Sequence, residues 1–291
     1  MWKPPRVIEV VLNGRLGNWL FEYAAGRALA LRRGTTLRLN LSHKRRLLDW
    51  RASWVVAQLR RFSLEAELST RAPGRGLHPY EEPSLEFSSA VLDLPNDTCL
   101  NGYFQSERYF QAIASTIRRE LVITPPNDAA TAAVEARIAA CISVAVHVRR
   151  TDYLRIGRDL LDLAWYATAM QHCREQHEAC RFFVFSDDPA WCRSHFTQAD
   201  CEVVDLPLSK RDPVNDLRLM TLCRHHIIAN STYSWWGAWL ASSPEKTVRA
   251  PSRWLPDSKG DAQLMATLLP PQWIRVENGT FPADGAARGH R

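Results

Sequence analysis

The sequence predicts an α/β protein of two Rossmann-like domains that face each other across a cleft. Its 291 residues fit two domains at about 150 residues each. The chain opens with a strand, a glycine-containing loop, a helix and a strand, and its second half alternates strands and helices, as in doubly wound parallel sheets. With 46% hydrophobic and 23% charged residues, the chain is neither disordered nor fibrous. The net charge of +6 is mild, so no nucleic acid partner is expected.

The first half begins with a βαβ unit. Apolar periodicity predicts, in order, a strand, a helix, a strand, a short strand and a helix over residues 6–12, 17–33, 35–41, 100–104 and 107–121. Gly34 is expected to cap the carboxyl end of the first helix. Residues 42–98 have no clear pattern, and we assign them no architecture.

The second half continues the alternation. Strands are expected over 142–149, 181–186, 202–206, 226–230 and 247–251, and helices over 163–178, 215–224 and 235–242. The sequence Thr-Pro-Pro-Asn over 124–127 is the best linker candidate. It divides the chain into an N-terminal α/β domain over 1–125 and a C-terminal α/β domain over 126–278. A frayed tail is expected over 279–291.

The seven cysteines do not predict a disulfide framework. Their number is odd and no secretory leader is evident, so we expect a reducing compartment. Cys173, His177 and Cys180 share a helix spacing, but it fits no zinc template, and we interpret them as packing residues. No run of about 18 apolar residues occurs, so no membrane span is expected.

His147 and Arg149 are candidate ligand-binding residues at the end of a predicted strand. The strand period of two places both side chains on one face, opposite Val144, Val146 and Val148. A guanidinium at a strand end is suited to bind phosphate oxygens through its planar fork. The alternative is a surface arginine paired with Asp152.

Two further segments lie where a strand meets a helix. In the segment 13–18, Gly17 lets the backbone approach a ligand and Asn18 falls in the first helical turn. The alternative is a tight structural turn. In the segment 230–239, Ser231 and Thr232 place hydroxyls at a helix start and predict a phosphate cradle. The alternative is an ordinary helix cap followed by core tryptophans.

Together these segments resemble the α-1,2-fucosyltransferases of glycosyltransferase family 11. The resemblance runs over residues 8–255 and rests on the blocks GRLGN (14–18), FEYAAGRALA (21–30), GYFQSERYF (102–110), HVRRTDY (147–153), FSDD (185–188) and 216–240, which contains ANSTYSWWGAWL (229–240). It implies a GT-B fold and transfer of L-fucose from GDP-fucose, with inversion, to the 2-hydroxyl of a terminal galactose. No cofactor and no metal are implied.

The resemblance also implies roles for the candidate residues. Arg149 would hold the β-phosphate, and Asn18 would approach that phosphate or the sugar, with Gly17 beside it. Arg150 and Asp152 would complete and brace the donor-binding motif.

The other implied donor contacts are divided between nucleoside and diphosphate. His147 and Asp216 would recognise the nucleoside side, while Ser231 and Thr232 would cap the diphosphate.

The general base and the acceptor preference are less defined. Asp187, Glu107 and His43 are base candidates without evidence to choose among them. Arg15, Trp19, Glu22 and Thr151 depart from the family's usual residues. The segment 42–98 is expected to select the acceptor.

Two alternatives stay open. One is another fucosyl linkage or another nucleotide sugar on the same scaffold, and the other is a sugar-nucleotide-binding protein without catalysis. We expect a bacterial protein that is cytoplasmic or peripheral at the inner membrane, with the basic clusters at 44–46 and at Arg60 and Arg61 as candidate contacts to anionic lipid carriers. As an enzyme it would build cell-surface polysaccharide.

Overall fold

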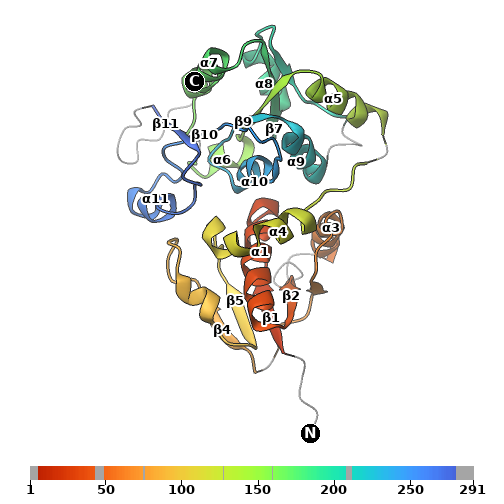
Figure 1. The fold of residues 1–291 in the computed structure, drawn as a ribbon, viewed down its shortest axis with the longest axis vertical. Coiled ribbons are helices and arrows are strands. Elements are labelled where there is room, and N and C mark those ends of the chain that lie inside the picture. Colours follow the sequence, from red (N-terminus) through yellow and green to blue (C-terminus); the bar gives the residue numbers. More distant parts are fainter. Residues whose placement is uncertain are drawn as a thin grey trace.

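The computed structural model describes residues 6–42, 49–74, 76–126, 128–158, 160–207 and 212–279. Two parallel sheets organise them, one in residues 7–101 and one in residues 142–276 (Figure 1). We call residues 6–126 the first half and residues 128–279 the second half. The sheets lie one above the other along the long axis of the molecule, with helices between them.

The first half contains a five-stranded sheet in the order β3-β2-β1-β5-β4. Its strands β1 to β5 are Val7–Val11, Thr36–Asn40, Glu67–Ser69, His78–Glu81 and Thr98–Asn101. Its helices α1, α3 and α4 are Leu16–Arg33, Asp49–Leu59 and Ala114–Glu120, and its 3₁₀ turns η1 to η3 are Ser89–Asp93, Glu107–Tyr109 and Gln111–Ile113.

The second half contains a six-stranded sheet in the order β11-β10-β9-β6-β7-β8. Strands β6 to β11 are Ile142–Val148, Cys180–Ser186, Cys201–Val203, His225–Ile227, Val248–Pro251 and Ile274–Val276. Helices α5 to α11 are Ala129–Ala139, Thr151–Arg155, Leu163–Gln176, Pro189–His195, Pro213–Leu222, Thr232–Leu240 and Ser258–Met265.

The βαβ opening is confirmed. β1 pairs in parallel with β2, and the left-handed Gly34 (φ 60°) closes α1 by donating its N–H to the carbonyls of Ala30 and Leu31. The alternation along β6 is also confirmed, because Val144, Val146 and Val148 pack in one core cluster and Ala145 in another. Buried strands with helices on both faces produce this two-sided pattern.

Several predicted boundaries are wrong, and among them the strands expected over 202–206 and 226–230 end at Val203 and Ile227. The helix expected over 107–121 consists of η2, η3 and then α4, because Phe110 is non-helical (φ −128°) and stacks on Trp236 at 5.4 Å. The strand expected over 100–104 runs instead over Thr98–Asn101, and Phe104 lies outside it with a positive φ of 50°. α10 begins at Thr232, three residues earlier than expected, since Ser231 already serves as its extended N-cap.

The segment 42–98, to which the sequence analysis assigns no architecture, contains α3, β3 and β4. β3 and β4 are three and four residues long and mostly exposed, so they carry no alternating apolar pattern. Their pairing with β2 and β5 forms the two edges of the first sheet.

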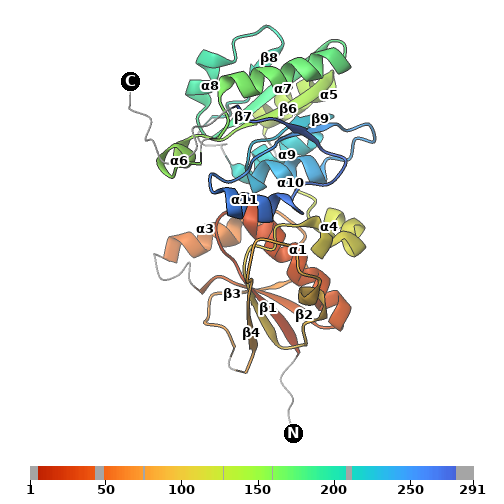
Figure 2. The ribbon, with the colours of Figure 1, turned by 90° about the vertical axis from the view of Figure 1, so that its left-hand side faces the viewer.

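One hydrophobic core runs through both halves. Phe21 of α1 lies 4.5 Å from Trp235 and 5.0 Å from Trp236 of α10, and Phe110 contacts both rings. Figure 2 shows α1 and α10 facing each other where the halves meet. The tryptophans of α10 are therefore core residues of the contact between the halves.

Candidate active site

A cavity of about 640 Å³ lies between the two halves. Residues of α1 and α3 contribute from the first half, and the carboxyl ends of β6 and β7 and the start of α10 contribute from the second. Parallel sheets bind ligands at such strand ends. The lining includes eight predicted site residues, Gly17, Asn18, His147, Arg149, Asp152, Asp216, Ser231 and Thr232.

The first turns of α1 and α10 touch in this cavity. The Thr232 hydroxyl donates to Asn18 Oδ1 at 2.9 Å, and Trp236 Nε1 donates to the Gly17 carbonyl at 3.0 Å. A Cβ at Gly17 would lie 2.4 Å from the Tyr233 backbone nitrogen, so only glycine permits this approach. Both helix N-termini therefore direct their positive ends toward one cavity.

Arg149 follows the last residue of β6 and is held between two aspartates. Its Nη2 lies 2.6 Å from Asp152 Oδ1, and its Nη1 lies 3.2 Å from Asp187 Oδ2. Asp152 also pairs with Arg15 across the cavity, at 3.3 Å. The ion pair between Arg149 and Asp152 is present, as the structural alternative expected, but it lies inside the cavity, and the Arg149 side chain is 16% exposed.

Asp187 is ionised in this setting. Burial alone would raise the pKa of its carboxyl, but the Arg149 charge and hydrogen bonds from the Thr151 hydroxyl and the Arg150 N–H together hold the pKa below its ordinary value. A carboxylate with a lowered pKa is a weak proton acceptor.

His147 is buried, with 4% of its surface exposed, and lines the cavity. Burial first, and the neighbouring Arg149 charge second, lower its pKa, so the imidazole is neutral. Its Nδ1 has no hydrogen-bond partner in the part of the chain that the structure describes, and its ring lies 5.4 Å from that of Tyr233. A buried unpaired nitrogen is costly, so a ligand group that pairs with it is favoured.

Arg150 does not line the cavity. Its guanidinium lies 3.7 Å from the centre of the Trp191 ring and 3.6 Å from Asp188. Only its backbone N–H reaches the site, through the bond to Asp187 at 2.9 Å. Glu107 also lies outside the cavity and accepts from Trp239 Nε1 at 3.0 Å, while His43 falls outside the described residues.

Two cavity residues of α3, Trp54 and Gln58, escaped the sequence analysis. They lie four residues apart on one helix face. Trp54 is half exposed with its ring edge against Trp19, at 6.2 Å between centroids. Gln58 is 5% exposed, and neither polar atom of its amide has a hydrogen-bond partner within the described ranges. No signal in the sequence could have found them, because the segment 42–98 has no readable periodicity.

Neither a metal cluster nor a membrane span occurs within the described residues. Cys173 Sγ lies 3.0 Å from Arg249 Nη1, and His177 stacks on His225 with 3.8 Å between ring centres. These side chains pack the second half, as expected.

The two described arginines of the basic clusters differ, because Arg60 is exposed whereas Arg61 is paired. Residues 44–46 lie outside the described residues, and Arg61 is paired with Asp212 and donates to the Thr124 carbonyl at 2.9 Å.

Curated relatives match nearly the whole chain. An α-1,2-colitosyltransferase of Escherichia coli is 27% identical over 93% of this chain and 99% of its own length. Human galactoside α-(1,2)-fucosyltransferase 1 is 27% identical over 93% of this chain and 75% of its own length.

Solved structures agree in fold. Fucosyltransferase NodZ from Bradyrhizobium matches with a TM-score of 0.54 and 13% identity, over 82% of this chain and 94% of its own. ADP-heptose heptosyltransferase II of E. coli matches with a TM-score of 0.51 and 12% identity, over 92% and 89% of the two chains. The fold is the GT-B arrangement of two Rossmann-like units across a cleft, as predicted. The sequence profile of glycosyl transferase family 11 matches residues 4–277, and the chain belongs to that family.

Proposed function

We propose that this glycosyltransferase moves L-fucose from GDP-β-L-fucose to the 2-hydroxyl of a terminal galactose, with inversion at the sugar. One observation carries the proposal. The Arg149 guanidinium lies at a strand end, in a cavity into which the first turns of α1 and α10 both project. A diphosphate leaving group matches this convergence of cationic and N–H donors.

The reaction breaks the bond between the fucose C1 and the β-phosphate oxygen and forms a bond from C1 to the acceptor oxygen. Negative charge grows on GDP as the bond breaks, and Arg149 together with the α10 N-terminus would stabilise it most in the transition state. The acceptor hydroxyl gives up its proton as the new bond forms. We assign no base, because Asp187, the candidate in the cavity, is engaged by Arg149 and has a lowered pKa.

The remaining lining residues fit the donor as follows. Neutral His147 offers its unpaired Nδ1 to the nucleoside side, and Asp216, in the first turn of α9, offers a carboxylate to the same part. Ser231 and Thr232 lie at the start of α10, where a diphosphate would sit, and Asn18 faces them from α1. Asp152 orients Arg149 through the 2.6 Å ion pair.

The α-1,2 linkage and the biological role are supported by the names of relatives. Both curated relatives described above carry an α-1,2 linkage in their names, and a third from E. coli, 26% identical over 84% of this chain, is named an O-antigen biosynthesis glycosyltransferase. We therefore propose a role in cell-surface polysaccharide synthesis, and a second donor, a nucleotide-activated colitose, is favoured by the name of the colitosyl relative.

The test is a turnover assay with purified protein, GDP-fucose and EDTA, with and without lactose, in which GDP release and the product linkage are followed by NMR. We expect an α-1,2-fucosylated product in the presence of EDTA. GDP release from GDP-colitose but not from GDP-fucose would identify GDP-colitose as the donor in place of GDP-fucose. Failure to bind GDP at all would overturn the assignment of the Arg149 cavity.

A further inference from the structure

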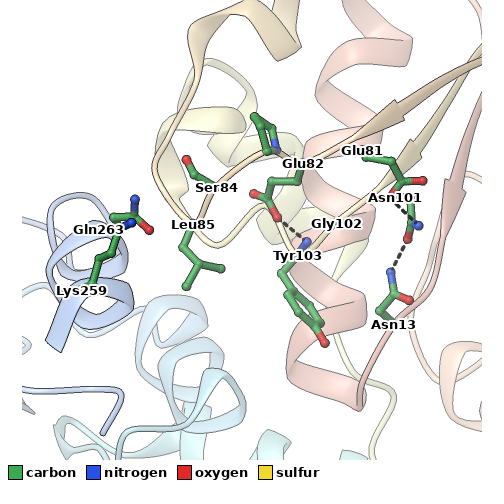
Figure 3. Close-up of a pocket in the computed structure, with 11 residues that line it drawn as sticks. Asn13, Glu81, Glu82, Ser84, Leu85, Asn101, Gly102, Tyr103, Lys259 and Gln263 are labelled. Atoms are coloured by element: carbon green, nitrogen blue, oxygen red, sulfur yellow. Dashed lines mark hydrogen bonds between the residues drawn. The ribbon is translucent and has the colours of Figure 1, made fainter. Parts of the chain in front are cut away.

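A second pocket, of about 550 Å³, lies beside the cavity at the carboxyl edge of the first sheet (Figure 3). Asn13 follows β1, Glu81 ends β4 and Asn101 ends β5. The chain leaves β1 toward β2 and β3 on one side, while β5 and β4 lie on the other, so the pocket opens where the strand order reverses. Open parallel sheets bind ligands at this position.

Polar side chains that line the pocket are fixed by hydrogen bonds to one another and to the backbone. Asn13 Nδ2 donates to Asn101 Oδ1 at 2.9 Å, and Asn101 Nδ2 donates to Glu81 Oε2 at 2.8 Å, as the dashed lines in Figure 3 show. Glu82 accepts from the Tyr103 N–H at 2.7 Å and from the Phe104 N–H at 3.0 Å. These bonds fix carboxylate and amide groups whose remaining hydrogen-bonding capacity faces the pocket.

The opposite wall comes from the second half. Lys259 and Gln263, four residues apart on α11, point into the pocket from across the gap between the halves (Figure 3). Lys259 is the single cation among the lining residues, against the two carboxylates of Glu81 and Glu82. Such a surface disfavours a phosphate and suits a neutral, hydroxyl-rich molecule, whose O–H groups donate to carboxylates.

The pocket and the Arg149 cavity share a wall. Leu85 and Tyr103 line both, and the Tyr103 ring is 39% exposed. Two residues further on, Gln105 Nε2 donates to Asn18 Oδ1 at 3.1 Å inside the cavity. A ligand that crosses Tyr103 therefore reaches from the pocket toward the bound donor.

We propose that this pocket binds the acceptor saccharide, with the reacting sugar at the Tyr103 rim and the next sugar between Glu81 and Gln263. The inference rests on the proposed function, which requires an acceptor beside the donor. The aromatic face at the rim provides apolar contact for a pyranose ring, and the carboxylates and amides bind its hydroxyls.

The test uses Glu81→Gln and Gln263→Ala, which change opposite walls of the pocket and leave the Arg149 cavity intact. Glu86→Gln is the matched control, because Glu86 lies in the loop that follows β4, is exposed and is not among the residues that line the pocket. Binding of lactose to the GDP-bound protein is measured by saturation-transfer NMR, GDP affinity by calorimetry, and donor and acceptor KM by turnover.

We expect each wall variant to weaken lactose binding and to raise the acceptor KM by about tenfold, because each loses one hydrogen bond to the saccharide. The affinity for GDP should stay unchanged. Unchanged lactose binding in both variants, or no lactose binding by the wild type, would overturn the inference. A parallel loss of GDP affinity would make the pocket part of the donor site and also overturn it. Failure of the proposed function is recognised separately, as absent GDP binding or turnover by the wild type.

Discussion

Arg149 is held by ion pairs inside the cavity, and the same side chain is the one that we propose binds the diphosphate of the donor. Its ion pairs with Asp152 and Asp187 hold the guanidinium in one orientation without a ligand. Pre-orientation of this kind lowers the entropy that is lost when a diphosphate binds. The two carboxylates also explain why a strand-end arginine stays in a partly buried cavity, since a buried charge is stable only when paired.

Arg149→Ala is expected to lower kcat by about 10² or more, because it removes charge stabilisation that is strongest as GDP leaves. Arg149→Lys is expected to be similarly poor, because an ammonium cannot replace the planar fork. Arg137→Ala, at an exposed arginine of α5, is the control. Steady-state kinetics measure kcat for variants that keep the wild-type melting profile. Near-normal turnover by Arg149→Ala would show that Arg149 does not stabilise the leaving diphosphate.

Gln58→Leu separates stability from function. The buried amide has no hydrogen-bond partner among the described residues, so an apolar side chain of similar size should raise the free energy of unfolding by about 1 kcal/mol. The same change should lower kcat/KM about tenfold, because we expect substrate to pair with the amide. Urea unfolding and turnover assays measure the two effects, with exposed Gln171→Leu as the control. Unchanged kcat/KM would assign Gln58 no role in binding.

At the scale of elements, the site depends on how closely α1 approaches α10. The two helices are in close contact at Gly17. A Cβ atom at this position would lie 2.4 Å from one backbone atom of α10 and 2.6 Å from another. The bond between Thr232 and Asn18 and the aromatic contacts of Phe21 lie directly beside it. Any shift of one helix therefore moves the two N-termini apart.

Gly17→Ala is expected to lower kcat/KM by about tenfold or more, since displacing catalytic groups by about an ångström costs activity steeply. Gly26→Ala is the matched comparison in the same helix, because the atoms nearest to its Cβ would be side-chain atoms of Val10 and Leu37 in the first half. We expect it to lower the melting temperature by overpacking while the folded protein keeps its kcat/KM. Equal kinetic losses in both variants would show that the α1–α10 contact has no special role.

At the scale of the whole molecule, the two sheets are joined by a common aromatic core. The rings of α10 pack on Phe21 and Phe110 of the first half, and the Arg118 guanidinium lies 3.9 Å over Trp239. The candidate active-site cavity lies beside this core, since Leu16 and Phe185 belong to both, so folding of the second half and assembly of the site are coupled.

The fold is expected to lose stability in mild acid because of buried neutral histidines. Burial, with smaller effects of the Lys246 and His225 charges, lowers the pKa of His226 to about 3. The unfolded chain binds that proton near pH 6.5, so stability is complete above this pH and falls as the pH drops toward the folded-state pKa. His226 alone should cost about 1.4 kcal/mol between pH 7.5 and 5.5.

Urea unfolding of the wild type and of His226→Gln at both pH values measures this linkage. The variant should lose about 1.4 kcal/mol less than the wild type over the interval, and His195→Gln, at an exposed histidine, should behave as the wild type. An identical pH slope for His226→Gln and the wild type would contradict the assignment of His226 as a titrating group.

The strongly periodic elements and the residues at strand ends can be predicted from the amino-acid sequence alone. The βαβ opening, the alternation along β6 and the closing Gly34 follow from local rules of period and backbone conformation. Eight predicted site residues reach one cavity, because the carboxyl ends of parallel strands meet at one edge.

The orientations of several side chains depend on neighbours that are distant in the sequence, and these could be known only from the folded structure. Arg150 turns to Trp191 although its neighbour Arg149 faces the cavity, and Gln58 enters the cavity from a segment without periodicity. Glu81 likewise takes its place in the second pocket only because β4 pairs with β5. Local sequence sets φ, ψ and face, but the neighbours of a side chain are set by packing of the whole chain, and those neighbours determine the chemistry of the site.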